Sequence, residues 1–381
     1  MRTTLALSVA ILIAACSGST EPDDPGNLVV TGLEGEVRLV EAVTGEIEEL
    51  DAAARHPGSI QPTASHDGRT IVWSAVTDDG QPVVRVHTDN IRRDIDLPTL
   101  PYLYAFDAGS VTLAALGNDP EGAGVALLLI DLEADEARIV EVGQPYYLDW
   151  HPSEPTLVVH VGTSDLAVLD TEGDRVRVAI EPGRFQAPAW TGEGGVLAPV
   201  SSEGATAAQG ELVQTTIDEL AVIDATDGSF QSVAAIDEMV MFEVAASRVA
   251  YVEGNMGVGP LTVVGLNGDD AVEVAEDVAA FEWSPSGDLL LFHVIEADVG
   301  FVPHVWDGEE VVEYPAFVPT VTFLSEYLPF WSQYARTITQ WAPDGTAFAY
   351  AEGTDEPTVW IQPRDGERRS MGAGVMVSWS P

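Results

Sequence analysis

Lysine is absent from this chain of 381 residues, and cysteine occurs once, at Cys16. The 16 basic residues are therefore all arginines and face 62 aspartates and glutamates, which gives a formal net charge of −46. A single cysteine excludes an internal disulfide framework and a cysteine-rich zinc or iron–sulfur site. Nucleic acid is excluded as a partner, because that affinity comes mainly from Lys and Arg that neutralise phosphates. The same charge disfavours adsorption of the folded part to anionic lipid.

The start of the chain lacks an apolar segment long enough to cross a membrane. The run from Leu5 to Ala15 has about 11 residues, whereas a spanning helix needs roughly 20. Residues 1–15 therefore predict a signal peptide. The segment Ile-Ala-Ala-Cys that ends at Cys16 resembles the bacterial lipobox. We expect Cys16 to carry a lipid that anchors the protein to a membrane of the cell envelope, outside the cytoplasm, and residues 16–27 to form a flexible tether. The alternative is an ordinary secretory signal with an incidental cysteine.

An internal repeat predicts the fold. The sequence FEWSPSGD at 281–288 and the sequence QWAPDG at 340–345 each precede an apolar run, and weaker copies occur throughout the chain. Their steps of 38 to 58 residues centre on the period of a β-propeller blade with four short strands. The aromatic or apolar residue that begins each copy, here called its anchor, is Ala64, Phe106, Trp150, Trp190, Val244, Trp283, Trp341 or Trp379.

The eight anchors predict an all-β protein, a β-propeller of eight four-stranded antiparallel blades, or of seven if the Phe106 or Val244 unit is miscounted. The fourth unit predicts strands at 146–150, 156–161, 165–170 and 175–180. Residues 377–381 form the first strand of a unit whose other strands, at 28–31, 36–41 and 46–50, lie at the opposite end of the folded part. Pairing of the C-terminal with the N-terminal strands would close the ring and cover two open sheet edges. Residues 28–381 are thus expected to form one domain.

The Trp-Ser-Pro-x-Gly units resemble the repeats of the TolB-like family of periplasmic and extracellular propellers, over residues 27–381. The resemblance implies the fold and says little about function, because propellers carry many unrelated activities.

Two long insertions indicate where binding is expected. They occupy 201–218 and 316–336, and strand parity places both on the same face of the ring, over blades 5 to 8. The second insertion has five aromatics at helical spacing, interrupted by Pro329, and ends at an arginine. The candidate ligand- or partner-binding residues are Phe323, Tyr327, Phe330, Trp331, Tyr334 and Arg336. One alternative is an aromatic clamp with a guanidinium, for an anionic or planar ligand or as a hot spot for a protein partner. The other is a filling for the mouth of a wide ring, in which Arg336 pairs with a carboxylate.

Catalytic motifs are lacking. The sequence has no Gly-x-Ser-x-Gly elbow, and its seven histidines are scattered without metal-binding spacing. His160 and His293 both fall in second strands and could project inward together. We expect no cofactor; the acidic turns at 78–80 and 268–270 are the places to inspect for Ca²⁺, although neither matches a calcium loop.

The sequence therefore favours a non-catalytic, lipid-anchored propeller that serves as a binding or scaffold module through its long-loop face. Its partner would be an envelope protein, a small molecule or an oligosaccharide. One alternative is a hydrolase or lyase with a metal in the central tunnel. The other is an extracytoplasmic sensor or an accessory protein of a membrane transporter.

The acidic residues are dispersed along the whole chain, which favours adaptation to salt over one functional patch. Self-repulsion then destabilises the fold at low ionic strength, because salt screens charges that are about 10 Å apart or more at 0.1 M. We expect the melting temperature to rise strongly between 10 mM and 1 M NaCl. A melting temperature that does not respond to salt would favour a functional, cation-attracting role instead.

Overall fold

The computed structural model describes residues 26–52, 62–144, 146–162, 165–178, 187–201, 217–237, 240–254, 257–334 and 336–380. Cys16, the predicted signal peptide and nearly all of the predicted tether lie outside the described residues, as does most of the insertion at 201–218. No helix in the described ranges is long and apolar enough to cross a membrane.

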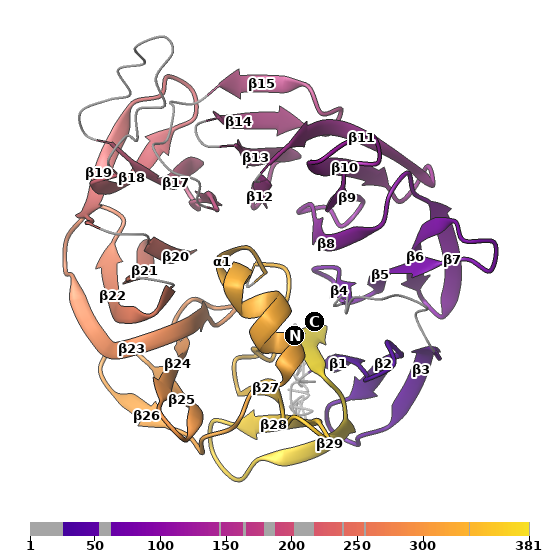
Figure 1. Ribbon diagram of the computed structural model, residues 1–381. Coiled ribbons are helices and arrows are strands. Elements are labelled where there is room, and N and C mark those ends of the chain that lie inside the picture. The colour runs from indigo at the N-terminus through magenta and orange to yellow at the C-terminus, as the bar shows by residue number, and fades with distance from the viewer. Residues whose placement is uncertain are drawn as a thin grey trace, which may run out of the picture.

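Antiparallel sheets stand radially around a central axis (Figure 1). Within the described ranges they number seven: five of four strands, one of seven and one of three. The first contains β1 (Asn27–Thr31), β2 (Val37–Glu41), β3 (Ile47–Asp51) and β30 (Met376–Ser380). The next two contain β4 (Thr63–Ala64), β5 (Thr70–Val76), β6 (Pro82–Thr88) and β7 (Ile91–Asp96), then β8 (Pro101–Phe106), β9 (Thr112–Asn118), β10 (Val125–Asp131) and β11 (Glu136–Gly143).

The other four-stranded sheets contain β12 (Tyr146–Trp150), β13 (Thr156–Val161), β14 (Asp165–Asp170) and β15 (Arg175–Val178), then β16 (Ala189–Trp190), β17 (Gly195–Val200), β18 (Glu219–Asp224) and β19 (Phe230–Ala235). The seven-stranded sheet contains β20 (Val240–Ala245), β21 (Arg248–Glu253), β22 (Gly259–Gly265), β23 (Val272–Trp283), β24 (Leu290–Glu296), β25 (Gly300–Trp306) and β26 (Val311–Glu313). The three-stranded sheet contains β27 (Ala347–Glu352), β28 (Thr358–Pro363) and β29 (Arg369–Ala373).

The predicted repeat matches these sheets closely. Strands β12, β13 and β14 have the predicted bounds, and β15 begins at the predicted residue, while 179–180 lie outside the described residues. The long strand β23 pairs with β22 through its first part and with β24 through its second, and so joins two repeat units into one sheet. An isolated bridge from Trp341 to Phe348 adds an inner partner to the three-stranded sheet.

The C-terminal strand completes the sheet of the N-terminal strands. β30 pairs antiparallel with β1, so that Leu28 lies opposite Trp379 and Val30 opposite Val377. Leu28, Val30, Val377 and Trp379 are buried in one apolar cluster with side chains of the neighbouring three-stranded sheet. The two ends of the described chain are thus fixed to each other by backbone hydrogen bonds and by packing.

Four of the tryptophan anchors link their repeat unit to the unit before it. In four units the anchor indole Nε1 donates a hydrogen bond to the backbone carbonyl of the residue that precedes the previous anchor. The bonds run from Trp150 to Ala105 (3.0 Å), Trp190 to Asp149 (3.2 Å), Trp283 to Glu243 (3.4 Å) and Trp341 to Glu282 (3.1 Å). The repeated Trp therefore has a structural reason: it reaches from one inner strand to the next.

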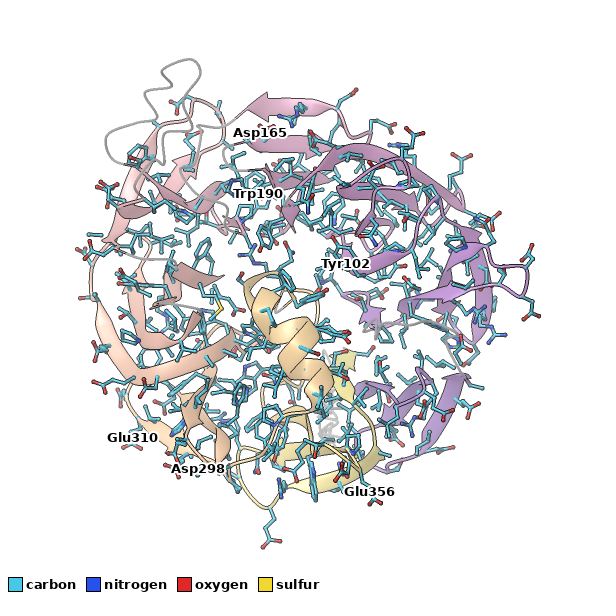
Figure 2. The ribbon with its side chains drawn as sticks, in the orientation of Figure 1. Tyr102, Asp165, Trp190, Asp298, Glu310 and Glu356 are labelled. Atoms are coloured by element: carbon cyan, nitrogen blue, oxygen red, sulfur yellow. The ribbon has the colours of Figure 1, made fainter. Side chains whose placement is uncertain are left out.

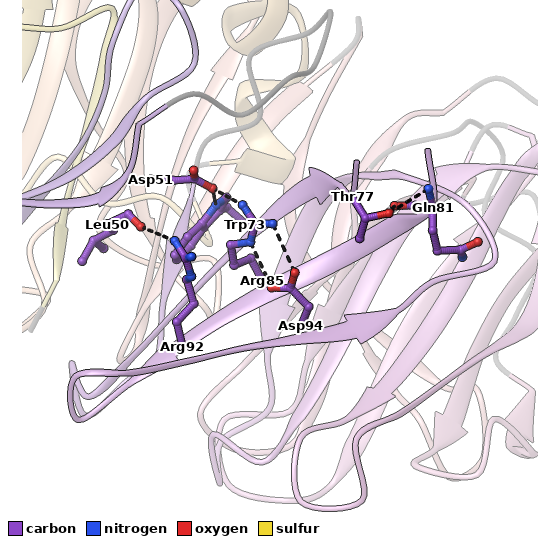
Figure 3. Close-up of polar contacts among 8 residues, drawn as sticks. All are labelled: Leu50, Asp51, Trp73, Thr77, Gln81, Arg85, Arg92 and Asp94. Atoms are coloured by element: carbon purple, nitrogen blue, oxygen red, sulfur yellow. Dashed lines mark hydrogen bonds and ion pairs between the residues drawn. The ribbon is translucent and has the colours of Figure 1, made fainter. Parts of the chain in front are cut away.

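Farther out, charged side chains link the first two sheets (Figure 3). The Asp51 carboxylate, at the end of β3, accepts hydrogen bonds from Trp73 Nε1 at 3.0 Å and from the Arg85 guanidinium. Arg85 also makes a two-pronged contact with Asp94, at 2.9 and 3.1 Å. Most other acidic groups lie at the surface: Asp298, Glu310 and Glu356 stand exposed at the outer rim (Figure 2). That dispersal agrees with the salt dependence expected above.

Removal of residues 376–381 should destabilise the ring severely, because β1 would lose its partner and three buried apolar side chains would be lost. At about 1.5–3 kcal/mol for each buried side chain, the loss in unfolding free energy is on the order of 5 kcal/mol. Chemical denaturation measures it, and a chain that lacks Pro381 alone is the control. An unchanged denaturation midpoint in the longer truncation would contradict the pairing of β1 with β30.

Candidate functional site

The second insertion folds as a short helical segment in the centre of the ring (Figure 1). It consists of a π-helical turn, η2 (Phe323–Tyr327), a 3₁₀ turn, η3 (Leu328–Phe330), and one α-helical turn, α1 (Trp331–Tyr334). Pro329 lies in the 3₁₀ turn between the other two pieces. The helical spacing and the interruption at Pro329 are therefore confirmed. Residues 321–336 are called the plug below.

Most predicted binding residues of the plug are buried. Tyr327, Trp331 and Tyr334 are 2%, 3% and 9% exposed, and Phe323 is partly buried against Trp331 at a ring distance of 5.6 Å. Phe330 alone among the five aromatics is exposed, at 49%. Tyr327, Trp331 and Tyr334 thus fill the ring and form no open clamp, which corresponds to the second of the two alternatives.

Polar groups of the plug bind open backbone edges of the inner strands. The Gln333 side-chain amide accepts from Leu148 N at 2.9 Å and donates to Leu148 O at 3.0 Å. Trp331 Nε1 donates to Phe281 O at 2.9 Å, and the Tyr334 hydroxyl donates to Tyr102 O at 3.2 Å. Because these acceptors belong to β12, β23 and β8, the plug ties three separate sheets together around the axis.

Arg336 lies at the inner end of the plug. Its guanidinium donates to the carbonyls of Ala187, at 3.2 Å, and Pro188. Burial lowers the pKa of Arg336, while the nearby charges of Asp149 and Glu243 act in the opposite direction. No ion pair of Arg336 is found within the described ranges, so the pairing with a carboxylate that the filling alternative included is replaced by bonds to backbone carbonyls.

A cavity of about 750 Å³ occupies the tunnel beyond the plug. Its outer wall consists of the turns that follow the anchors, and its inner end includes Gln333 and Arg336. We call the side of the ring that carries these turns the turn face. Adjacent turns contact one another, as His66 N to Ser110 Oγ at 3.3 Å and Arg248 to Gly287 O at 2.8 Å show. The exposed residues at the mouth are His66, Ala108, Pro152, Ala246, Pro285 and Ser286.

Successive strands of a unit run in opposite directions, so the turn after an inner strand and the loop before it lie on opposite faces of the ring. The turn face is therefore opposite to the face on which the long insertions were expected. The plug precedes the inner strand of its unit, whereas the cavity is lined by the turns that follow the inner strands. The hollow is therefore reached from the side of the short turns, and the aromatic insertion closes its other end.

Three carboxylates face this cavity from equivalent positions of the repeat. Asp149, Glu243 and Glu282 each precede an anchor, on β12, β20 and β23. Each accepts a backbone hydrogen bond from the next unit: Asp149 from Trp190 N at 2.8 Å, Glu243 from Trp283 N at 3.2 Å, and Glu282 from Gln340 N at 2.9 Å. Sequence reasoning missed them because 62 acidic residues obscure any pair. The alignment of the repeats, which puts an acid directly before three anchors, was the available signal.

Burial sets the ionisation of these groups. It raises the pKa of Glu243 to about 8 and the pKa of Glu282 well above its usual value, where the neighbouring Glu243 adds to the effect. Burial also raises the pKa of Asp149, while the charge of Arg336 and the Trp190 N–H oppose the shift. Glu243 is 8% exposed, and its Oε1 atom has no hydrogen-bond partner. This oxygen is the one described carboxylate atom of the cavity that is both buried and unpartnered.

The histidines have structural surroundings. His151 Nδ1 accepts from the backbone N–H groups of Ser153 and Glu154, at 3.2 and 2.9 Å, and so caps its turn. His160 and His293 are 1% and 0% exposed and lie on β13 and β24, in separate sheets. Burial lowers the pKa of His293 to about 4, although its contact with Gln340 Oε1 opposes the shift.

The described residues contain no cluster of side chains that could bind a metal ion. No three His, Cys, Asp or Glu side chains there are arranged to hold an ion. The two turns chosen for Ca²⁺ use their acids locally: Asp79 accepts from the Thr77 hydroxyl, and Asp269 accepts from Asn267 Nδ2 at 2.9 Å.

No family model and no curated protein matches this chain. Among solved structures, the dihydro-heme d1 dehydrogenase NirN, in complex with DHE, aligns with a TM-score of 0.60 at 13% identity, over 95% of this chain and 76% of that one. The β-propeller domain of the Trilobed protease from Pyrococcus furiosus aligns with a TM-score of 0.47 at 12% identity, over 81% and 95%. TolB from Acinetobacter baumannii aligns with a TM-score of 0.38 at 13% identity, over 67% and 65%.

Identities this low show the fold alone, and of these three only NirN aligns closely enough to carry even that argument. With the radial sheets of Figure 1, the chain has a β-propeller fold. A propeller fold does not choose between binding and catalysis, because propellers carry many unrelated activities.

The raised pKa of Glu243 predicts a pH-dependent cost to stability. A carboxyl whose folded pKa lies near 8, above its usual 4.5, favours folding fully below pH 4.5 and loses that contribution as the pH rises through 8. Glu243→Gln removes the ionisable group while its side-chain oxygen can still accept from Trp283 N. We expect this variant to match the wild type near pH 5 and to exceed it at pH 9 by on the order of a few kcal/mol.

Thermal and chemical denaturation between pH 5 and pH 9 measures this difference. Glu356→Gln, at the exposed rim, is the matched control and should show no such trend. A difference between wild type and Glu243→Gln that stays constant over this range would disprove the assignment.

Proposed function

We propose that this protein is a non-catalytic binding module that holds its ligand in the turn-face cavity. The observation that supports this proposal is the cavity itself. It is large enough for a small organic molecule, and convergent polar groups line an otherwise largely apolar wall. The groups that could do acid–base chemistry are engaged in structure. Asp149, Glu243 and Glu282 hold backbone N–H groups of the next unit, and His151 caps its own turn.

A second candidate is a hydrolase or lyase that uses the same cavity. The observation in its favour is the neighbouring pair Glu243 and Glu282, whose pKa values are both raised by burial. Carboxyls with raised pKa in a cavity are typical of general acids, although buried structural groups show the same shift. Because each of the two already holds a backbone N–H group, catalysis is the weaker proposal.

We also infer that the ring has eight units. The seven-stranded sheet contains two anchors, Val244 on β20 and Trp283 on β23, and therefore counts as two units that share the long strand β23. The three-stranded sheet gains an inner position from the Trp341 bridge. With β30 supplying the inner strand of the N-terminal sheet, every predicted anchor then belongs to one unit.

Lipid anchoring at Cys16 and an envelope location remain part of the proposal. Asn27 pairs with Ser380, at the end of an inner strand, so the described chain begins on the turn face. The eleven residues from Cys16 to Gly26 are joined by ten Cα–Cα steps and can span at most about 35 Å when fully extended. A lipid on Cys16 would therefore keep Gly26, on the turn face, within that distance of the membrane surface.

Phe330 exposes an apolar side chain on the long-loop face, where a protein partner could cover it. It is 49% exposed, and Val321 and Leu324, also in the plug, are 61% and 42% exposed. We propose this small apolar surface as the place for an envelope partner, apart from the ligand in the cavity. A sensor, or an accessory protein of a membrane transporter, would use both the cavity and this apolar surface.

A melt screen against amines, saccharides, peptides and organic anions tests binding, and product analysis of every hit tests catalysis. Ala108→Trp narrows the exposed mouth of the cavity, and Ala134→Trp, on an exposed outer turn, is its control. We expect at least one compound class to raise the melting temperature of the wild type and the control but not of Ala108→Trp, and to be recovered unchanged. Conversion of a hit would favour the enzyme, and an absence of any mouth-dependent hit would contradict the cavity as a binding site.

A further inference from the structure

We propose that the cavity binds a small organic cation, with an ammonium or guanidinium group that donates to the unpartnered oxygen of Glu243. This inference rests on the proposed function, which it deepens by naming the ligand class. It also assigns a binding role to the position directly before the anchor, which in other units carries Thr63, Ala105 or Ala189.

Glu243 Oε1 is the starting point. The other oxygen of this side chain accepts from Trp283 N, which fixes the carboxyl on the cavity wall. Oε1 is buried and has no donor. A buried acceptor of this kind is rare in native structures and favours a ligand that brings an N–H or O–H donor.

In its ionised form Glu243 offers Oε1 as an acceptor, and a cation compensates the buried negative charge better than a neutral donor does. Asp149 on β12 and Glu282 on β23 face the same cavity, so three carboxyls stand against the single guanidinium of Arg336. Arg336 already donates to the carbonyls of Ala187 and Pro188. The remaining titratable groups at the cavity are His66 and His151, in the turns at its mouth.

The shape of the wall favours an organic cation over a metal ion. Asp149, Glu243 and Glu282 do not converge into a group that could hold a metal, since none is found within the described ranges. Trp150 and Trp190 line the same cavity and offer apolar surface to a carbon skeleton or to the cation itself. A volume of about 750 Å³ also exceeds what a bare ion needs.

Binding should release a proton. With its pKa raised to about 8 by burial, the Glu243 carboxyl is mostly protonated at pH 7 in the empty cavity. An ammonium that donates to Glu243 stabilises the carboxylate, so the carboxyl O–H gives its proton to solvent as the cation enters. Affinity should therefore rise with pH up to about 8 and then level off, whereas nonspecific attraction to exposed acids would be constant over this range.

Isothermal titration of the full folded chain with agmatine, which carries a guanidinium and an ammonium, tests the proposal. n-Pentanol and maltotriose are the neutral probes, and 0.5 M NaCl suppresses nonspecific attraction to a chain of net charge −46. We expect agmatine affinity to increase about 75-fold between pH 6 and pH 8.5, because the ionised fraction of a carboxyl with a pKa of about 8 grows by that factor and binding displaces the proton. Repeating the titration in buffers of different ionisation heat should show proton release below pH 8.

Glu243→Gln should weaken agmatine binding at pH 8.5 at least about 10-fold and abolish the pH dependence. Glu356→Gln, at the rim, should change neither, and circular dichroism verifies that both variants fold. Equal binding by the two variants, or a pH-independent affinity, would overturn the proposal.

The experiments distinguish a wrong ligand class from a wrong binding site. If maltotriose binds in a mouth-dependent way and agmatine does not, the cation is wrong and the cavity remains a binding site. If neither the melt screen nor these probes finds a compound sensitive to Ala108→Trp, the proposed function fails as well.

Discussion

The open backbone edges of the inner strands constrain the whole structure. A ring of radial sheets leaves one edge of each sheet facing the axis, where its carbonyls and N–H groups need partners. Here the anchor indoles bind carbonyls of the preceding unit, and acids that precede the anchors bind N–H groups of the following one. Consecutive sheets are thereby joined in both directions near the axis, and the charged contacts of Asp51 and Arg85 add to this farther out.

The same constraint explains the plug. Aromatic side chains fill one end of the tunnel, and Gln333, Trp331, Tyr334 and Arg336 supply hydrogen bonds to edges that no strand covers. The filling stops partway along the axis, and the space that remains is the cavity. The functional proposal follows from that geometry: three carboxyls that join neighbouring repeat units also line this cavity, and Glu243 keeps one oxygen without a partner.

The fold was largely readable from the sequence because the anchor motif recurs. Strands β12 to β14 and the pairing of the last strand with β1 follow from the spacing of the anchors and from the alternation within each unit. The helical nature of the plug followed from the spacing of its aromatics and from Pro329. These features depend on local pattern and period, which one sequence contains.

The site was much less predictable. Whether Trp331 and Tyr334 face solvent or the axis depends on how far the insertion enters the tunnel, and spacing does not encode that depth. Arg336 was expected to meet a carboxylate and instead binds two carbonyls, because those edges lie next to it in space and far from it in sequence. The sequence could not separate the cavity acids from the many exposed ones. Glu243 differs from exposed glutamates only in its position within the repeat, directly before an anchor.

The central claim is that the packed ring keeps Glu243 protonated and available in a cavity at neutral pH. Infrared difference spectroscopy of the wild type and of Glu243→Gln observes this directly through the carboxylic acid C=O stretch. The account predicts a protonated-carboxyl band in the difference between wild type and variant that disappears as the pH rises through about 8, whereas the band of Glu282, whose pKa is also raised, is present in both proteins. A difference spectrum in which the Glu243 band is already absent at pH 6 would contradict the account.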